Sequence, residues 1–163
     1  MDGLWLSFRL LLLLAVANGS PILAKRLVDP RWSMPLDGGL HFFDGRPLLG
    51  PSKTVRGTIA AIVASALAAP ALGIPVGLGA LIGVAAMVGD TLSSFIKRRL
   101  GVASSAQAMG LDQIPEALLP MLAVQGPLDL SIRQIIGITL VFFALEIPFA
   151  RLFYWLGIRD KPY

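Results

Sequence analysis

An acidic residue and a cluster of cations lie close together near the middle of the chain. Asp90 stands near the end of a long apolar run, and three consecutive cations, residues 97–99, follow it. A carboxylate at the end of a membrane segment is energetically costly, so it is a functional candidate by default. If the segment is helical, spacings of three, four and seven residues put four polar side chains on one face: Asp90, Ser93, Ser94 and Lys97. Such a face offers a carboxylate to a metal ion and cations to phosphate groups.

A second pair of cations lies near the predicted start of a helix. Pro51 suits the first turn of a helix, and Ser52 or Thr54 could cap it, so we expect a helix to begin here. Lys53 and Arg56 are three residues apart and can point the same way. Free N–H groups at a helix start, flanked by two cations, would bind phosphate. The same pattern is equally typical of cations that anchor a membrane helix at the lipid headgroups.

Three further polar groups interrupt apolar segments. Asp112 and Gln113 carry oxygen donors beside an apolar run, where an aspartate is also a common helix N-cap. Residues 18–21, Asn-Gly-Ser-Pro, predict a break in the first apolar segment, or a kink held by hydrogen bonds between helices. Glu146 is either a partner for Arg151 or a cavity residue, and the sequence does not decide between these roles.

The composition is that of an integral membrane protein. Hydrophobic residues make up 55% of the 163 residues and charged residues only 15%, which is too apolar for a soluble domain of this length. We expect one domain over residues 1–163. The absence of cysteine excludes disulfides and thiolate metal sites, and the single histidine, His41, argues against zinc. The net charge of +4 favours lipid headgroups or anionic substrates, and not nucleic acid, as partners.

The hydrophobic runs predict an all-α membrane fold with about five transmembrane helices. The expected spans are residues 4–23, 58–72, 76–96, 114–124 and 132–156, with a tight turn at residues 73–75. The second and fourth are short, so we expect them to be tilted, broken or partly buried. Basic residues between spans one and two, after span three and at the C-terminus (Arg159 and Lys161) then share the cytoplasmic side. This places the N-terminus outside and the C-terminus inside, and disfavours a cleaved signal peptide at the N-terminus.

The connection between the first two spans, residues 25–52, is long and polar. It is too polar to lie in the membrane and too long for a simple connector, and loops of this length are usually functional or disordered. Its length and glycine content lead us to expect that the part around His41 and Asp44 covers a cavity on the cytoplasmic side.

Taken together, these motifs resemble the CDP-archaeol synthase family, membrane relatives of the CDP-diacylglycerol synthases. The resemblance runs through most of the chain, and the string from Ser94 to Gly101, together with its order after the Lys-Thr element, is specific. The matching motifs are Ala17-Asn18 with Pro21, Pro35-Leu36-Asp37-Gly38-Gly39, Asp44-Gly45-Arg46, Leu49-Gly50 with Lys53-Thr54 and Gly57, Gly89-Asp90, Ser94-Phe95-Ile96-Lys97-Arg98-Arg99-Leu100-Gly101 and Leu111-Asp112-Gln113.

The resemblance implies a five-helix membrane fold with a charged cytoplasmic cavity and transfer of CMP from CTP to a lipid phosphate, releasing pyrophosphate. It implies Mg²⁺ as cofactor and CTP, a lipid phosphate and membrane lipids as partners. No obligate protein partner is evident from the sequence. A lipid phosphomonoester carries about −1.5 to −2 charge at pH 7, so the nucleophile needs no base. Cations and metal must instead bring two anions together.

The resemblance also assigns roles to particular residues. The implied catalytic residues are Asp90, Asp112 and Lys97. The implied substrate-binding residues are Lys53, Thr54, Arg56, Ser94, Arg98, Asn18 and Gln113. The implied metal ligands are Asp90, Asp112 and Glu116. In the family pattern a second aspartate follows three residues after Asp112, where this chain has Pro115, so Glu116 is the candidate to replace it.

Two other classes of function remain open from the sequence. Asn18, Asp90 and Glu146 in a small helical protein would suit a transporter or flippase, although we find no matched pair of broken helices in two halves. A non-catalytic membrane scaffold that binds nucleotide would account for the missing aspartate at Pro115.

Overall fold

The computed structural model of the chain describes residues 3–104, 106–155 and 157, and over these residues it is helical. The elements in order are α1 (Gly3–Leu27), η1 (Pro30–Trp32), α2 (Val55–Ala68), η2 (Pro70–Leu72), α3 (Val76–Arg99), α4 (Gln113–Ala123), α5 (Gln125–Leu128) and α6 (Ile132–Trp155). Extended pairing in this part of the chain is limited to two isolated bridges, Pro35 with Thr54 and His41 with Pro47. The predicted all-α class is confirmed.

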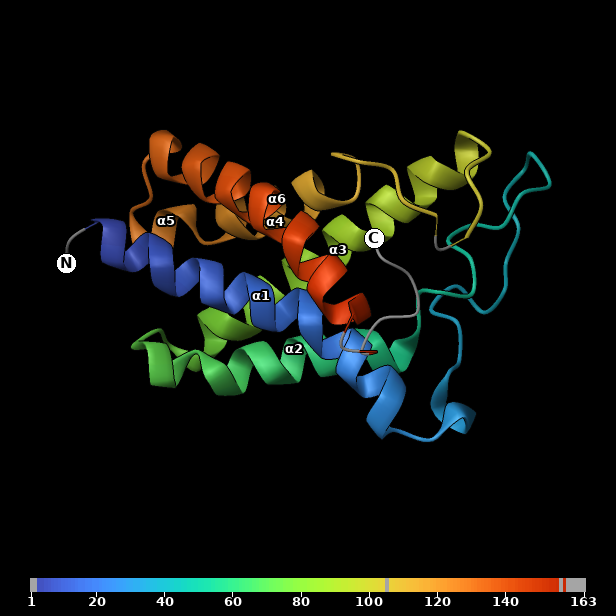
Figure 1. Cartoon of the computed structure of the whole chain (residues 1–163), viewed down its shortest axis with the longest axis horizontal. Helices are drawn as coiled ribbons and strands as arrows, with labels where there is room; N and C mark the ends of the chain where they lie inside the picture. The colour runs from blue at the N-terminus through green and yellow to red at the C-terminus, as the bar shows by residue number, and fades with distance from the viewer. Residues whose placement is uncertain (1–2, 105, 156, 158–163) are drawn as a thin grey trace.

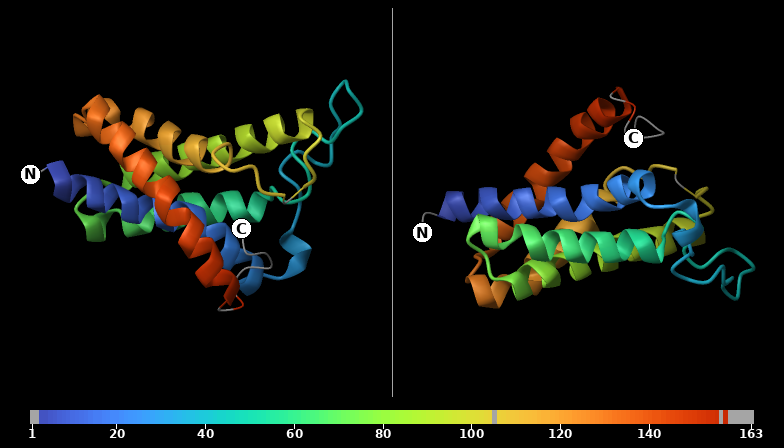
Figure 2. Two further views of the ribbon diagram at one scale, coloured as in Figure 1. Left: turned by 45° about the horizontal axis from the view of Figure 1, so that its top comes forward. Right: turned by 90° about the horizontal axis from the view of Figure 1, so that it is seen from below.

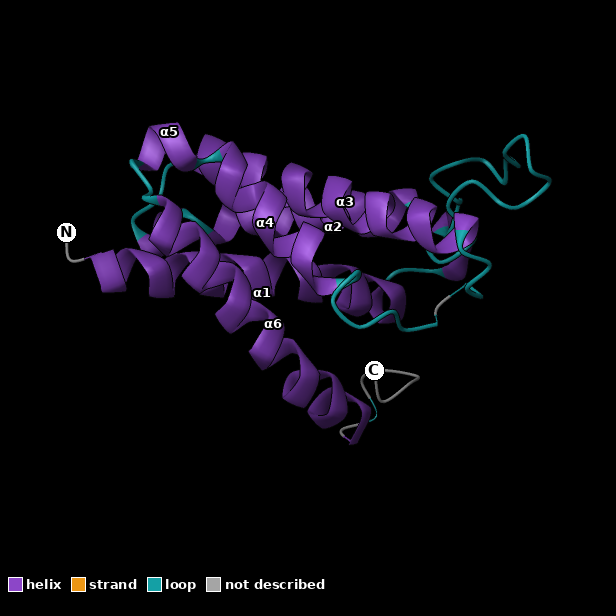
Figure 3. Cartoon of the chain, turned by 90° about the horizontal axis from the view of Figure 1, so that it is seen from above, coloured by secondary structure: helices purple, strands orange, loops and turns teal. Residues whose placement is uncertain are grey.

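The helices form a bundle (Figure 1). α1 packs against α2, α3 and α6, α3 packs against α2 and α4, and α4 packs against α6. The core lies toward the start of α1, and its fully buried side chains include Leu10, Leu13, Leu14, Ile82, Met121 and Ile135. The long loop before α2 and the loop after α3 lie together at the other end of the bundle (Figure 3). The second half of α6 diverges from the other helices (Figure 2).

Glycines in α3 set how closely its neighbours approach. A Cβ at Gly79 would lie 2.4 Å from the Ala69 side chain, and one at Gly83 would lie 2.8 Å from the Ile62 Cα. A Cβ at Gly89 would lie 2.3 Å from the Pro115 carbonyl oxygen on the opposite side, at the start of α4. Small residues at such positions let helix backbones pack in direct contact in a membrane bundle.

Three helices are long and apolar enough to cross a membrane. They comprise Gly3–Leu27, Val76–Arg99 and Ile132–Leu152, which match the first, third and fifth predicted spans.

The second and fourth predicted spans, α2 and α4, are shorter than a bilayer is thick. α2 has 14 residues and α4 has 11, or about 21 and 17 Å at 1.5 Å per residue. Both lengths are less than the roughly 30 Å of bilayer hydrocarbon. α2 ends at Ala68 because η2 and the left-handed Gly73 (φ 66°) turn the chain, as expected for residues 73–75.

Two local predictions need correction. Of the two alternatives at residues 18–21, the break is wrong, because α1 continues to Leu27. Within it, Asn18 Nδ2 donates to the Leu14 carbonyl (3.0 Å) and Ser20 Oγ donates to the Val16 carbonyl, so these polar groups bond inside the helix.

The second correction concerns the start of α2. Of the two predicted caps, Thr54 is confirmed: it is the N-cap, and its Oγ1 accepts a hydrogen bond from the Gly57 N–H (3.2 Å). The helix therefore begins at Val55, and the placement of Pro51 in its first turn was wrong. Lys53 therefore lies before the helix, and the three-residue helical spacing to Arg56 does not apply to it.

The loop before α2 is tied to itself on both sides of Lys53. The Leu36 N–H donates to the Lys53 carbonyl (2.8 Å), and the Val55 N–H donates to the Met34 carbonyl (3.0 Å). The buried Asp37 carboxylate accepts N–H groups from Leu49 (2.8 Å) and two glycines, Gly39 (3.0 Å) and Gly50 (3.2 Å). Burial alone would raise the pKa of Asp37, but these three N–H groups lower it below its ordinary value. The loop thus holds Lys53 in one place.

The tip of this loop, residues 40–48, docks on the end of α3 and projects beyond it (Figure 1). Arg46 Nη1 donates to the carbonyl oxygens of Arg98 (3.2 Å) and Arg99 (2.5 Å), and Arg99 pairs with Asp44 (3.0 Å). Residues of this tip line neither of the two cavities described below. The expectation that His41 and Asp44 cover the cavity is therefore wrong, because their segment is fixed to the outer end of α3.

Candidate active site

A polar cavity of about 450 Å³ lies between α1, α3, α4 and α6 at the loop end of the bundle. Its ionisable lining residues are Lys25, Arg26, Lys53, Asp90, Lys97, Arg98, Asp112, Glu116 and Glu146. α2 and α4 both begin beside this cavity, so their short length leaves room for it. The arrangement places five cations and four acids around one space inside a largely apolar bundle, a costly feature that indicates function.

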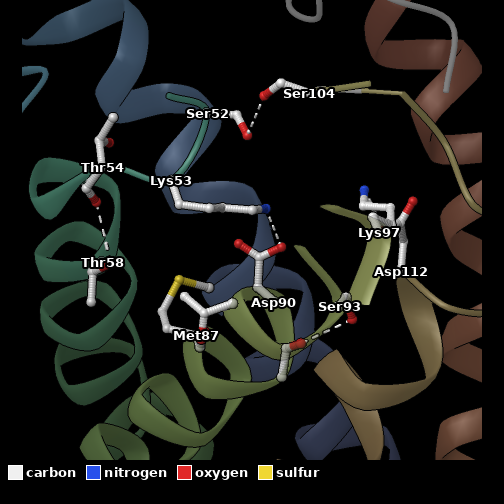
Figure 4. Close-up of polar contacts among 12 residues, drawn as sticks. Ser52, Lys53, Thr54, Thr58, Met87, Asp90, Ser93, Lys97, Ser104 and Asp112 are labelled. Carbon is white, nitrogen blue, oxygen red and sulfur yellow. Dashed lines mark hydrogen bonds and ion pairs between the residues drawn. The ribbon is translucent and has the colours of Figure 1, made fainter. Parts of the chain in front are cut away.

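Lys53 and Asp90 form an ion pair at the centre of this end of the bundle (Figure 4). Their side chains are 18% and 21% exposed. Burial lowers the pKa of Lys53, but the nearby carboxylates, Asp90 first and then Glu116 and Asp112, raise it more, and the net direction is upward. Lys53 therefore stays cationic at neutral pH, and its ion pair with Asp90 orients its ammonium group in the cavity, where it can bind an anion.

Glu116 brings a second acid to Asp90. The direct packing of Gly89 on the Pro115 carbonyl sets α4 against α3, and the carboxyl groups of Asp90 and Glu116 contact each other. Glu116 is only 9% exposed. Two carboxylates in contact repel unless a proton or a cation lies between them. Pro115 thus supplies a backbone contact, and the acid that follows it reaches the position near Asp90.

Lys97 and Asp112 form a second ion pair across the cavity (Figure 4). Lys97 Nζ lies 2.6 Å from Asp112 Oδ1 and donates to the Ala106 carbonyl at 3.1 Å. Asp112 Oδ2 accepts from the Ala108 N–H at 2.8 Å. Asp112 stands at the N-cap position of α4, but its side chain makes no capping hydrogen bond. Its carboxylate is directed to Lys97 and the preceding loop, so simple capping does not explain it.

Four more of the predicted residues line the same cavity: Asn18, Ser94, Arg98 and Gln113. Arg98 is 6% exposed, and its Nη2 donates to the Ala103 carbonyl at 2.8 Å. Gln113 Oε1 accepts from the Gly110 N–H at 2.8 Å. Glu146, whose role the sequence left undecided, also lines this cavity.

Three predicted polar residues lie elsewhere. Thr54 and Arg56 line a second, adjoining cavity of about 380 Å³, and Arg56 Nη1 donates to the carbonyl oxygens of Val28 (2.8 Å) and Asp29 (3.1 Å). Ser93 is buried, and its Oγ donates to the Gly89 carbonyl (2.9 Å). The predicted polar face of α3 is therefore Asp90, Ser94 and Lys97, without Ser93.

Sequence reasoning missed two cations of the first cavity, Lys25 and Arg26 at the end of α1. Lys25 is seven residues after Asn18, a spacing that places both on one face of a helix. The expected helix break at residues 18–21 concealed this signal.

The chemistry of the lining suits a divalent cation without a complete protein cage. Among the described residues, no three acidic or histidine side chains are close enough together to hold a metal ion. Asp90 and Glu116 do contact each other, and Asp112 lines the same cavity. Mg²⁺ is usually bound by one or two carboxylates together with substrate phosphates, so this donor set fits Mg²⁺ that arrives with a nucleotide.

The fold and the site define a small helical membrane protein with a polar cavity lined by both cations and acids. The CarS-like CDP-archaeol synthase family model matches residues 10–163. The CDP-archaeol synthase of Sulfurisphaera tokodaii is 35% identical over 91% of this chain and 89% of its own length. That of Pyrobaculum arsenaticum is 39% identical over 77% of this chain and 78% of its own length.

A solved structure of an intramembrane enzyme for archaeal membrane lipid biosynthesis is also similar. Its identity is 31% and its TM-score 0.71, over 86% of this chain and 89% of the solved chain. The chain belongs to the CDP-archaeol synthase family. The predicted family, and with it the class of membrane-bound, CTP-dependent cytidylyltransferase of lipid biosynthesis, is confirmed. The transporter and scaffold alternatives are therefore set aside.

Proposed function

We propose that this chain transfers CMP from CTP to an isoprenoid ether-lipid phosphate within the cavity, on the cytoplasmic side of the membrane. The observation that carries the proposal is the pairing of two lysines with two aspartates, Lys53 with Asp90 and Lys97 with Asp112, around one cavity. The names of the relatives, which are CDP-archaeol synthases, support the ether lipid as acceptor.

The reaction joins two anions, so the main task of the site is charge compensation. An oxygen of the lipid phosphate forms a bond to the α-phosphorus of CTP, and the bond from that phosphorus to the bridging oxygen of the β-phosphate breaks. Pyrophosphate leaves with the electron pair. The attacking phosphate is already ionised at pH 7, so the absence of a histidine from the cavity lining is no obstacle.

The cations of the cavity bind the phosphates in this proposal. Lys53, Lys97 and Arg98 are held by carboxylate or carbonyl partners, so they are oriented before substrate arrives. Preorganised charges of this kind stabilise a transition state without reorganisation. Asn18, Ser94 and Gln113 contribute polar contacts from three different helices.

We propose Mg²⁺ as the cofactor, with Asp90 and Glu116 as the two carboxylates that would hold it directly and Asp112, in the same cavity, as a third acid that would reach it only with the nucleotide bound. Bound there with the nucleotide, Mg²⁺ would neutralise phosphate charge and polarise the α-phosphate. The contact between Asp90 and Glu116 supports this proposal, since a cation between them removes their repulsion.

The test is pyrophosphate release by the purified protein with CTP, Mg²⁺ and either an isoprenoid ether phosphate or a diacyl phosphate. We expect release that requires both CTP and lipid, together with a CDP-lipid seen by mass spectrometry. Asp90→Asn is expected to lower kcat/KM at least about 100-fold, or about 2.7 kcal/mol. Asp129→Asn, in the turn after α5 at the opposite end of the bundle, is the matched control and should leave activity unchanged. Full activity of Asp90→Asn would refute the assignment.

A further inference from the structure

The last turn of α3 carries two cations of the cavity, Lys97 and Arg98, and its end is closed by the residues that follow it. Gly101 is left-handed (φ 75°), and its N–H donates to the Arg98 carbonyl (3.1 Å). The Val102 N–H donates to the Lys97 carbonyl (2.9 Å), and together the two bonds form a Schellman motif. The position of this capped turn decides where the two cations lie in the cavity.

Two arginines join this turn to the tip of the loop before α2. From the tip, Arg46 Nη1 donates to the Arg98 carbonyl (3.2 Å) and to the Arg99 carbonyl. In the other direction, Arg99 Nη2 donates to the Pro47 carbonyl (2.6 Å), and Arg99 Nη1 pairs with Asp44 (3.0 Å). Each segment therefore receives a guanidinium group from the other. We call Arg46 and Arg99 the arginine clamp.

Aromatic rings enclose the Arg99 half of the clamp. Its guanidinium carbon lies 4.7 Å from the centre of the Phe42 ring and 5.0 Å from that of Phe95, within the range of a cation–π interaction. The two rings also pack edge to face at 5.4 Å. Phe42 belongs to the tip and Phe95 to α3, so these contacts join the same two segments, and only 19% of the Arg99 side chain is exposed.

The loop that the clamp holds is the one that brings Lys53 to the cavity. Between the tip and Lys53, the loop touches the segment after α3 a second time. Ser104 Oγ donates to Ser52 Oγ (3.4 Å), and a Cβ at Gly50 would lie 3.2 Å from Ser104 Oγ. Docking of the loop on the end of α3 therefore sets the distance between Lys53 and the cations of the last turn.

We propose that Arg46 and Arg99 are positioning residues, which hold the loop that carries Lys53 at a fixed distance from the last turn of α3. The inference rests on the proposed function, in which the cations on both segments bind the phosphates. Neither arginine lines a cavity, so the clamp acts through the backbones that it joins. Without it, binding of CTP would have to order the loop, and the free energy of ordering would weaken binding.

The test compares variants of Arg46 in the purified full-length protein. Arg46→Gln removes the guanidinium group, whereas Arg46→Lys keeps a cation that can donate to the same carbonyl groups. Arg31→Gln is the matched control, because Arg31 is an exposed cation earlier in the same loop and lines neither cavity. The measurements are steady-state kinetics with varied CTP, the Kd of CTP with Mg²⁺ by calorimetry, and amide hydrogen exchange without substrate.

We expect Arg46→Gln to raise both the KM and the Kd of CTP about tenfold, because only a fraction of the molecules has the loop in place. Saturating CTP orders the loop again, so kcat should stay within about twofold of wild type, which also shows that the variant folds. The Gly101 and Val102 amides should exchange at least about tenfold faster. Arg46→Lys should recover most of the affinity, and Arg31→Gln should match wild type.

Arg99→Gln removes the other half of the clamp and supplies a second test. Because the two arginines act as one unit, the double variant should bind CTP within about twofold of the weaker single variant, whereas independent effects would multiply. Multiplied effects would overturn the inference, as would a fall in kcat with an unchanged KM. A wild-type protein that binds CTP and forms no CDP-lipid would refute the proposed function, while the Kd and exchange measurements would still decide the role of the clamp.

Discussion

Lys53 pairs with Asp90 and, in the proposed function, binds the phosphates of the substrate. Lys53→Met keeps the length of the side chain and removes its charge, so Asp90 is left without its cation. We expect kcat/KM to fall at least about 100-fold, equivalent to about 2.7 kcal/mol, with weaker CTP binding. Arg133→Gln, an exposed cation near the start of α6, is the control and should retain wild-type kinetics. Equal kinetics for the two variants would contradict the role given to Lys53.

Glu116 offers a separate test of the metal assignment. Glu116→Gln keeps the shape of the side chain but removes the second carboxyl group from Asp90. We expect the Mg²⁺ concentration for half-maximal activity to rise about tenfold, because an amide is a weaker ligand than a carboxylate for this ion. The measurement is a titration of activity with Mg²⁺ at saturating CTP. An unchanged Mg²⁺ requirement would show that Glu116 does not hold the metal.

At the scale of elements, the contact between α3 and α4 places the acids. A methyl group at Gly89 would meet the Pro115 backbone at 2.3 Å, so Gly89→Ala must push the helices apart. We expect a lower Tm, loss of about 1–3 kcal/mol of stability as for overpacking, and impaired catalysis. Gly77→Ala, also in α3 but with open space around its Cβ position, is the matched control. A Gly89→Ala protein as stable and active as Gly77→Ala would mean that this contact does not matter.

The loop before α2 depends on Asp37, whose lowered pKa gives a pH test. The folded loop prefers the ionised carboxylate, so its stabilisation is complete above the unfolded pKa of about 3.9 and is lost as the pH falls through the folded pKa. Asp37→Asn loses an acceptor for the N–H groups of Leu49 and Gly50. We expect these amides to exchange hydrogen about tenfold faster in the variant at pH 7. The difference should begin to shrink as the pH falls below about 3.9 and disappear only below the lowered folded pKa of Asp37; a difference that stays constant through this range would exclude ionisation as the cause.

The elements that apolar periodicity controls were the predictable ones. Five apolar runs correspond to α1, α2, α3, α4 and α6, and the turn at Gly73 was expected from its sequence. At the start of α2 the Thr54 cap was predicted correctly, but Pro51 was wrongly placed in the first turn. The Lys53 carbonyl bonds to the N–H of Leu36, seventeen residues away, and local propensity contains no such information. The break considered as one alternative at Asn18 was wrong for the opposite reason, since a local hydrogen bond to the Leu14 carbonyl satisfies the Asn18 amide within an intact helix.

Much of the site was also predictable, because a helical face follows from spacing alone. Asp90, Ser94 and Lys97 share a face in α3 as expected, while the positions of Asp112 and Glu116 relative to them depend on how α4 packs. The division of the cations between two cavities could not be predicted, since it arises from the separation of α2 and α3 beyond Gly83.

At the scale of the whole molecule, the proposed orientation places both long loops and the cavity in the cytoplasm. The basic residues of the described chain support it, because they concentrate in the loop before α2 and at the end of α3. The C-terminal cations Arg159 and Lys161 lie outside the described residues. α2 and α4 are shorter than the bilayer hydrocarbon is thick, so the predicted count of five spans needs a direct test.

The absence of cysteine makes that test simple, since each introduced cysteine is the sole thiol. Phe43→Cys places it on the fully exposed tip of the loop before α2, and Ser131→Cys places it in the exposed turn before α6. In intact cells, a membrane-impermeant maleimide should label Ser131→Cys, and it should label Phe43→Cys only after the membrane is opened. With an even number of spans between these positions, both would share one side and label alike. Opposite labelling therefore requires an odd number of crossings between these positions, which are α3 alone or α2, α3 and α4 together, and it places the loop end of the bundle where CTP is available.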